Sequence, residues 1–297
     1  MKADPKGKSL KDTDWLIKSY ATTVIQSIYS IKTMRALAGK SNAPRPIVAF
    51  ADPVFSKAAP TRASVQIGAN NNRSLAVFYK DTKLDLVGLG ESLSPLPGTR
   101  REVEAIGKTL GARPTELVFG AEVTETKVKQ TKLDQYRVVY FATHSLVAGE
   151  LESFGKAKAE PSLVMSIPDR PTDLDDGLLS ASEASQLKLN ADWVVLSACN
   201  TASADGVGAD ALSGLARAFL YAGARSLIVS HWEIEDETTA KLMSRVFDLS
   251  QRNKTMTHGE VMQQATLELL ASAKDDDDAH PGLWAPFVVV GEPGRSR

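Results

Sequence analysis

Two residues of the chain could form an acyl-transfer site, because each directly follows an apolar run that predicts a buried strand. Cys199, the only cysteine among 297 residues, ends the stretch WVVLSAC, and His144 ends the stretch VVYFATH. A thiolate is a strong nucleophile, and a nearby imidazole can accept the thiol proton and later protonate a leaving amine. The backbone N–H groups of Cys199 and of Ser145 would lie near the reacting carbonyl and could stabilise its oxyanion.

Each of the two residues also has a structural interpretation. Free cysteine is among the most frequently buried residue types, and a histidine at a strand end is commonly a hydrogen-bonded structural group. Cys199 follows His144 by 55 positions (199 − 144), close to the roughly 50 residues that separate the histidine and cysteine of caspases in the same order. With this spacing, a catalytic role for His144 and Cys199 is as well supported as a structural role in the core.

The composition, 43% hydrophobic and 24% charged, is that of an ordinary globular protein. A net charge of −1, from 35 basic and 36 acidic side chains, gives no reason to expect nucleic acid or a membrane surface as a partner. The single cysteine excludes an intramolecular disulfide and a cluster of thiolate metal ligands, and it fits a reducing compartment. No apolar run reaches the roughly 18 residues of a membrane span. We therefore expect a soluble, cytoplasmic chain.

The N-terminal third contains two strong signals. Apolar residues recur at helical spacing between Asp14, which can cap a helix, and Gly39, which can end it. The β-branched residues at positions 22–24 weaken this prediction, so a strand followed by a helix stays open as an alternative. Ile47–Phe50, bounded by prolines, reads as a buried strand. Between 51 and 97 the apolar runs are short.

After position 97, strands and helices alternate. Apolar runs predict strands at 116–120, 137–144, 162–168, 193–199, 224–232 and 285–292, and helical patterns occupy 99–111, 124–136, 179–189, 209–223, 236–251 and 258–274. The strand runs are almost continuously apolar, which is typical of a parallel sheet covered by helices on both faces. In such a sheet, functional residues lie just beyond the carboxyl ends of the strands. Both His144 and Cys199 occupy that position.

Four blocks of the sequence together resemble the CHAT family. They are FATHS at 141–145, DDGLLSASEASQLKLNADWVVLSACNTA at 175–202, LSGLARAFLYAGARSLIVSHWEIEDETTAKLM at 212–243 and LWAPFVVVGE at 283–292. CHAT domains are caspase-like and are often attached to tetratricopeptide repeats. The resemblance implies a caspase-like three-layer α/β/α sandwich with a mainly parallel sheet. We expect residues 1–97 to form a less regular N-terminal portion that packs on a catalytic core at 98–297.

The resemblance implies a cysteine endopeptidase in which Cys199 is the nucleophile and His144 the general base. It requires no metal and no organic cofactor. The sequence departs from the family pattern at Ser145, where glycine is usual, in NTASADG after the cysteine, and at His231. A serine would be strained at position 145 if the backbone there needed a positive φ. These departures keep a catalytically inactive interaction module open as the alternative.

Three further residues are candidates for binding the substrate. Ser197, two positions before Cys199, resembles the residue that often lines the cleavage-site pocket of caspase-like peptidases. Trp232 could form an apolar wall, and Glu235 or Asp236 could face a basic substrate side chain. The capping of the helix that follows is a stronger interpretation of Asp236. A nucleotide-binding enzyme is disfavoured, because neither GxGxxG nor GxxxxGK[ST] follows any strand.

The remaining candidates have simpler structural interpretations. The acidic run Asp275–Asp278 lacks the glycine-punctuated spacing of a calcium loop and predicts a solvated loop. His258 and His280 read as helix-start and loop residues. The partners expected from the resemblance are a protein substrate and a regulatory repeat domain, either on a partner chain or in a missing N-terminal repeat region.

Overall fold

A computed structural model describes residues 9–25, 41–56, 79–80, 83–84, 86–146, 160–172, 174–197, 209–232 and 236–291. At 79–80, 83–84, 209–213 and 236 the description is limited to the backbone.

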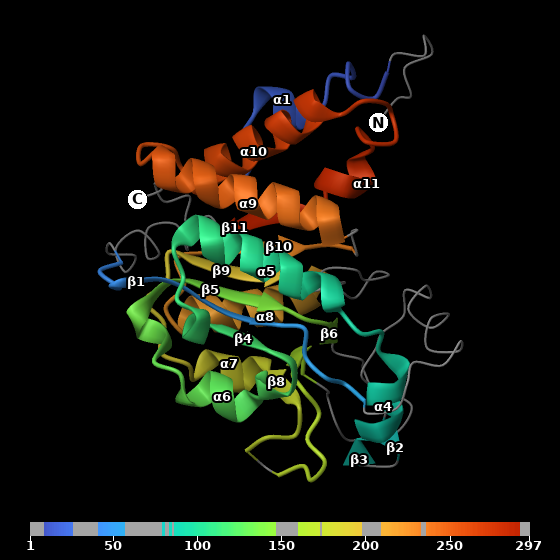
Figure 1. Cartoon of the computed structure of the whole chain (residues 1–297), viewed down its shortest axis with the longest axis vertical. Helices are drawn as coiled ribbons and strands as arrows, with labels where there is room; N and C mark the ends of the chain where they lie inside the picture. The colour runs from blue at the N-terminus through green and yellow to red at the C-terminus, as the bar shows by residue number, and fades with distance from the viewer. Residues whose placement is uncertain are drawn as a thin grey trace.

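The centre of the fold is a six-stranded sheet with the spatial order β11-β10-β9-β5-β1-β4 (Figure 1). In chain order its strands are β1 (Arg45–Ala51), β4 (Leu117–Phe119), β5 (Tyr136–Ala142), β9 (Trp193–Ser197), β10 (Ser226–Ser230) and β11 (Phe287–Gly291). All neighbouring strands pair in parallel except β10 and β11, which are antiparallel. The predicted, mainly parallel sheet is confirmed.

Helices cover both faces of this sheet (Figure 1). One face packs against α5 (Pro97–Leu110), α9 (Asp236–Arg252) and α10 (His258–Ser272), and the other against α6 (Glu125–Gln130), α7 (Ala181–Ser185) and α8 (Ala209–Tyr221). Alternate side chains of β5 serve the two cores: Tyr140 contributes to the α5/α9 side, and Phe141 to the α8 side. Burial on both faces explains why the strand sequences are continuously apolar, and the expected three-layer α/β/α sandwich is confirmed.

Short elements complete the architecture. A three-stranded antiparallel sheet is formed by β6 (Ser145–Leu146), β7 (Ser162–Val164) and β8 (Leu178–Ser180), and a hairpin by β2 (Tyr79–Lys80) and β3 (Lys83–Leu84). The described residues also form the helices α1 (Leu16–Ser19), α4 (Leu86–Ser92) and α11 (Pro281–Trp284) and the 3₁₀ turns η2 (Pro114–Glu116), η3 (Gly120–Glu122) and η4 (Leu133–Gln135). The strand predicted at 162–168 therefore exists as β7, but outside the main sheet.

The N-terminal helix predicted from Asp14 is wrong over most of its described length. Helix α1 ends at Ser19, and its N-cap is Trp15, without a side-chain capping bond. Val24 instead forms a parallel bridge to Val290 next to β11: its N–H donates to Val289 O at 2.8 Å. The β-branched residues at 22–24 favour this extended backbone, as the strand alternative anticipated. Gly39 lies outside the described residues.

Residues before position 97 also contribute to the main sheet, because β1 lies between β5 and β4. Helix α5 starts at Pro97 and ends before Gly111, whose φ of 74° closes the helix with a left-handed residue. The division of the chain at 97/98 stays a prediction.

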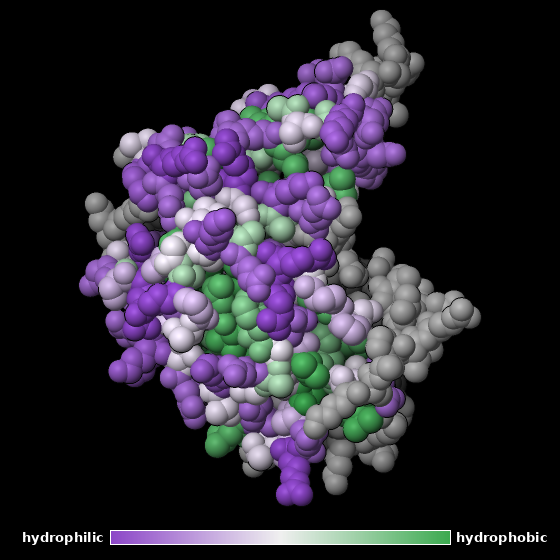
Figure 2. Space-filling model, viewed as in Figure 1, coloured by the Kyte–Doolittle hydropathy of each residue, from purple (hydrophilic) through white to green (hydrophobic). Residues whose placement is uncertain are grey.

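Hydrophilic residues cover most of the face in Figure 2, and apolar residues form a strip at the level of β1 and β4. β4 is an edge strand, and the Arg100 guanidinium lies 4.4 Å from the centre of its Phe119 ring. Among the helices that the structure describes, none is both long and apolar enough to cross a bilayer.

One titratable side chain is built into the α10 side of the core. His258, 2% exposed, stacks on Trp193 with 3.7 Å between ring centres. Burial, together with the positive charge of Arg225, lowers the pKa of His258 to about 3. The imidazole is therefore neutral in the folded protein at any pH above that value.

We predict that replacing His258 with phenylalanine weakens the acid sensitivity of the fold. In the wild type, the unfolded chain binds a proton at this histidine below pH ~6.5 while the folded chain does not, so stability falls as the pH drops from there towards 3. The loss between pH 7 and pH 5 amounts to about 2 kcal/mol. His258→Phe keeps an aromatic ring beside Trp193 and removes this loss, as urea unfolding at the two pH values would show.

The control is His280→Asn, at an exposed helix cap whose Nδ1 accepts from Gly282 N. This variant should keep the wild-type difference between the two pH values. An unchanged pH dependence in His258→Phe would contradict the assignment of a neutral, buried imidazole.

Candidate active site

The carboxyl ends of β5 and β9 meet at one edge of the sheet. The two strands pair in parallel, with Ala142 opposite Ser197 as the last matched residues. His144 follows two positions after the end of β5. Cys199, the predicted nucleophile, belongs to the segment 198–208, which lies outside the described residues.

His144 is enclosed, with 0% of its surface exposed. Its Nε2 lies 2.8 Å from the carbonyl oxygen of Ser94, in the loop between α4 and α5. The ring of Phe55, just after β1, lies 5.0 Å from the imidazole centre. On the other side, the His144 carbonyl accepts from Val164 N of β7 at 2.8 Å. Contacts from three separate segments thus hold both the backbone and the ring of this histidine.

The contact with Ser94 determines which imidazole nitrogen carries the proton. A carbonyl oxygen can only accept a hydrogen bond, so Nε2 must donate. In the neutral ring, the lone pair is then on Nδ1. The next residue, Pro95, restricts Ser94 to an extended backbone, and Pro97 opens α5. The two prolines restrict the backbone of this loop and therefore the direction of the accepting carbonyl.

Ser145 begins β6 and pairs with Leu163 of β7. The bond from Val164 N to His144 O identifies Ser145–Leu163 as a non-hydrogen-bonded pair, so the Ser145 N–H points away from β7. Among the described residues, Asp52 (φ 53°) is the one non-glycine with a positive φ. The φ of Ser145 is therefore not positive, and the serine is free of the backbone strain that it would have in a left-handed conformation.

Buried polar side chains near this edge of the sheet are joined by hydrogen bonds. The hydroxyl of Tyr140, on β5, donates to Oε1 of Glu102, on α5, and both side chains are buried. Burial and the nearby Glu102 raise the pKa of Tyr140 well above its ordinary value, and a hydrogen bond with Ser197 acts in the opposite direction. Ser197, the candidate pocket residue, is thereby connected to α5 through Tyr140.

Neither Glu102 nor Tyr140 was predicted from the sequence as part of the site. The signal was present for Glu102, because it lies on the same helical stripe as the buried residues Thr99, Val103 and Ile106. A carboxyl group on a buried helical face needs a polar partner. The tyrosine in the strand VVYFA is the residue that supplies it.

The remaining candidates lie near the ends of other elements. Trp232, two residues past β10, is 42% exposed, and its Nε1 donates to Gly282 O at 2.9 Å. Burial lowers the pKa of the adjacent His231. Asp236 is the first residue of α9, and only its backbone is described. Glu235 lies outside the described part of the chain.

No metal site is present among the residues that the structure describes, where no group of three or more His, Cys, Asp or Glu side chains could hold an ion. The acidic run ties the N-terminal segment to the end of α10 instead. Asp276 accepts from the Ser9 hydroxyl at 2.6 Å and from Leu10 N at 2.8 Å. Asp278 accepts from Lys274 N, and its own N–H donates to Asp275.

The family model of the CHAT domain matches residues 2–292 of the chain. The chain belongs to the CHAT-domain family. This CHAT domain is 30% identical to mouse tetratricopeptide repeat protein 28 over 221 residues, which are 66% of the chain and 9% of that protein. It is 27% identical to the human protein of the same name over 247 residues, 75% of the chain and 10% of the relative.

The chain thus spans about a tenth of the length of these relatives. Among solved structures, the CHAT domain is similar to the Arg-specific cysteine proteinase gingipain R, with 12% identity and a TM-score of 0.46, over 91% of this chain and 53% of that one.

We predict that Tyr140→Phe destabilises this CHAT domain by about 1–3 kcal/mol, because it removes a donor from a buried carboxyl group. The matched control is Tyr136→Phe on the same strand, whose hydroxyl accepts from the partly exposed Arg45 at 2.8 Å. That change should cost less than about 1 kcal/mol. Urea unfolding of both variants gives the comparison, and equal effects would contradict a stabilising role for the Glu102–Tyr140 bond.

Proposed function

We propose that this CHAT domain is a cysteine endopeptidase that cleaves protein substrates through Cys199 and His144. Membership of a family whose domains are caspase-like supports the reaction class. The orientation of His144 carries the proposal: a buried imidazole at the carboxyl edge of the sheet, with Nε2 bound to a backbone carbonyl, offers Nδ1 as the basic nitrogen.

The register of the sheet supports the pairing of the two residues. Ala142 is opposite Ser197, so positions 144 and 199 are each two residues beyond a matched pair. Neighbouring parallel strands are about 4.8 Å apart. A dyad needs the sulfur and the base within hydrogen-bond reach, and this register is compatible with that requirement.

In the proposed reaction, Nδ1 of His144 accepts the Cys199 thiol proton, and the sulfur attacks the scissile carbonyl carbon. A C–S bond forms, the C–N bond breaks, and His144 protonates the leaving amine. Water then attacks the thioester and gives a proton to His144, and the Cys199 thiol leaves with that proton. The products are a new amine and a new carboxylic acid, which releases its proton to water and becomes a carboxylate, and no cofactor takes part.

The backbone N–H groups of Ser145 and Cys199 are proposed as oxyanion donors. The ladder between β6 and β7 supports the role of Ser145, because its N–H points away from β7. The Ser145 backbone also lacks the positive φ that would disfavour a serine there.

For substrate binding we propose Ser197, Trp232 and Asp236. Ser197 is small and uncharged, so it can line a pocket but cannot select a charged side chain by itself. Trp232 presents a partly exposed indole two positions after β10. The tetratricopeptide repeat relatives support a regulatory repeat domain as a further partner.

A catalytically inactive interaction module is the second candidate function. The observation that favours it is the complete burial of the His144 side chain. In that case the same contacts with Ser94 and Phe55 serve only to stabilise the fold. The two candidates differ in what they predict for the reactivity of Cys199.

We predict that iodoacetamide alkylates Cys199 rapidly near pH 7, and that His144→Ala slows the reaction about tenfold, because the thiolate loses its base. The chain has one cysteine, so the mass shift reports this residue alone. His231→Ala, a second histidine next to a strand end, is the matched control and should leave the rate unchanged. Slow alkylation in wild type and His144→Ala alike would favour the interaction module.

We also predict that wild-type protein generates new N-termini in an unfolded protein mixture, detected by mass spectrometry. Cys199→Ala and His144→Ala should each reduce the rate by at least about 10³-fold while the protein remains folded, because residues of one catalytic unit fail together. Cleavage by wild type at the rate of Cys199→Ala would contradict the peptidase proposal.

A further inference from the structure

The two contacts that hold the His144 ring come from segments that are far apart in the chain. Phe55 follows β1, and Ser94 follows α4. The ring keeps its orientation only if these two segments keep their positions relative to each other. They meet at Gly90, where α4 approaches the backbone of Phe55.

Gly90 packs directly against a main-chain carbonyl. It is one of the buried residues of α4. A Cβ atom at this position would overlap the carbonyl oxygen of Phe55 and would lie 3.1 Å from Cδ1 of Ile167. A side chain could rotate away from such a conflict, but a carbonyl oxygen moves only with its backbone. Glycine is therefore the residue that permits so close an approach of α4 to Phe55.

The backbone beside Phe55 is held from the other side. The Val54 N–H donates to the Ser166 hydroxyl at 2.9 Å, and the Val54 carbonyl accepts from Ile167 N at 3.0 Å. The Ser166 hydroxyl in turn donates to the carbonyl of Gly120 at 2.9 Å. Because these bonds restrain the segment after β1, a larger residue in place of the α4 glycine would displace the helix instead of this segment.

A displacement of α4 would reach His144 through Ser94. Ser94 lies four positions after Gly90 and two after the last residue of the helix. The distance between His144 Nε2 and the Ser94 carbonyl oxygen is 2.8 Å, and at about 3.6 Å the two atoms would no longer form a hydrogen bond. A movement of about 1 Å is therefore enough to release the ring.

We propose that Gly90 is a positioning residue: it lets α4 approach Phe55 closely enough for the Ser94 carbonyl to hold His144 with the proton on Nε2. With a side chain at this position, the imidazole loses its carbonyl partner, and its proton is then shared between the two ring nitrogens. The consequence for catalysis rests on the proposed peptidase function, in which His144 acts as a base through Nδ1. The orientation of the ring does not rest on that function, so the two can be tested apart.

The orientation of the ring can be measured without any substrate. The chain has four histidines, and ¹⁵N NMR of protein labelled at histidine separates protonated from unprotonated ring nitrogens. At about pH 8, above the ordinary histidine pKa of ~6.5, the signals that disappear in His144→Ala should show Nε2 protonated in the wild type. Gly90→Ala should replace this state by a mixture of the two tautomers. A Gly90→Ala protein that keeps the wild-type tautomer overturns the proposal.

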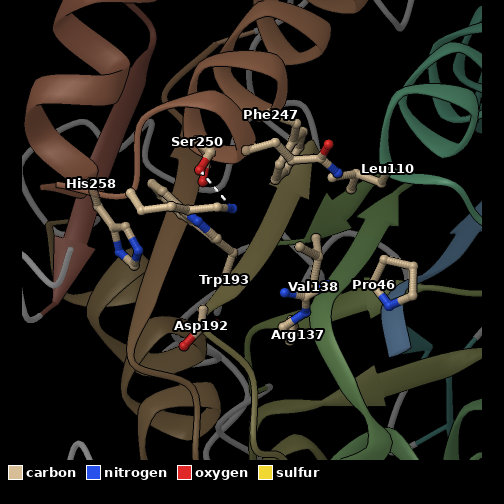
Figure 3. A pocket seen from close by; sticks show the side chains of 11 residues that line it. Pro46, Leu110, Arg137, Val138, Asp192, Trp193, Phe247, Ser250 and His258 are labelled. Carbon is tan, nitrogen blue, oxygen red and sulfur yellow. Dashed lines mark hydrogen bonds between the residues drawn. The ribbon is translucent and has the colours of Figure 1, made fainter. Parts of the chain in front are cut away.

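Two references show whether the change at His144 is local. His258 lies at the opposite edge of the sheet, among the side chains that line a cavity (Figure 3), so its signals should be the same in wild type and variant. Gly111→Ala is the matched control, because it strains a residue of positive φ at the far end of α5, where a Cβ meets no atom within 4 Å. It should leave the His144 tautomer unchanged. Mixed tautomers in Gly111→Ala, or a change at His258 equal to that at His144, would indicate general loosening and overturn the specific role of Gly90.

The reactivity of Cys199 separates this proposal from the peptidase proposal. If both hold, Gly90→Ala slows alkylation by iodoacetamide near pH 7 about tenfold, as His144→Ala does, because a misdirected base no longer ionises the thiol. Mixed tautomers in Gly90→Ala together with slow alkylation of the wild type support the role of Gly90 and overturn the peptidase. Mixed tautomers together with alkylation as rapid as in the wild type overturn the role of Gly90 in positioning the base.

A second variant covers the case in which Gly90→Ala does not fold. Leu93→Ala removes a buried side chain next to Ser94 without introducing a steric conflict. Because Leu93 packs in the same hydrophobic cluster as Phe55, its loss loosens the contact between the two segments and should also mix the His144 tautomers. A folded Leu93→Ala protein with the wild-type tautomer at His144 overturns the proposal.

Discussion

The pairing of β5 with β9 is the constraint on which the candidate active site depends. Both strands are buried on two faces, so alternate residues must match two different cores: Tyr140 and Val195 on the α5/α9 side, Phe141 and Leu196 on the α8 side. A slip of one residue would exchange the two sets and place the polar Tyr140 hydroxyl away from Glu102. The register that satisfies both cores also places positions 144 and 199 at the same offset beyond the strands.

The main architecture could be predicted from the sequence because its signals are local. Continuous apolar runs predicted every strand of the six-stranded sheet, and helical periodicity predicted α5, α8, α9 and α10. The helix prediction for the N-terminal segment was wrong because the spacing of its apolar residues fits a helix, while its β-branched residues fit an extended chain. Pairing of Val24 with β11, more than 260 positions away, decides between them, and no local pattern contains that contact.

The candidate site likewise combines features with a local sequence signal and features that depend on long-range contacts. The position of His144 at a strand end is visible in the sequence, but the group that orients its ring is a backbone carbonyl 50 positions earlier. Every residue has a backbone carbonyl, so the identity of Ser94 does not show that it accepts this hydrogen bond. The neighbouring prolines are the only feature of the sequence that marks the loop. Glu102 and Tyr140 could have been found as a pair only by asking which strand residue satisfies a carboxyl group on a buried helical stripe.

The two edges of the sheet differ in electrostatics for a reason that lies in the helices. The carboxyl end of α9 directs its last carbonyls, including that of Ser250, towards the amino edge of the sheet, where they stabilise the Lys254 ammonium. The amino end of α10 begins there at His258, and its partial positive charge adds to those of Lys254 and Arg137. Burial and the charge of Arg137 lower the pKa of Lys254, whereas Asp192, which lies at this edge beside the two cations, raises it. The helix ends thus set the electrostatics of the amino edge, whereas at the carboxyl edge a backbone carbonyl, that of Ser94, orients the His144 ring.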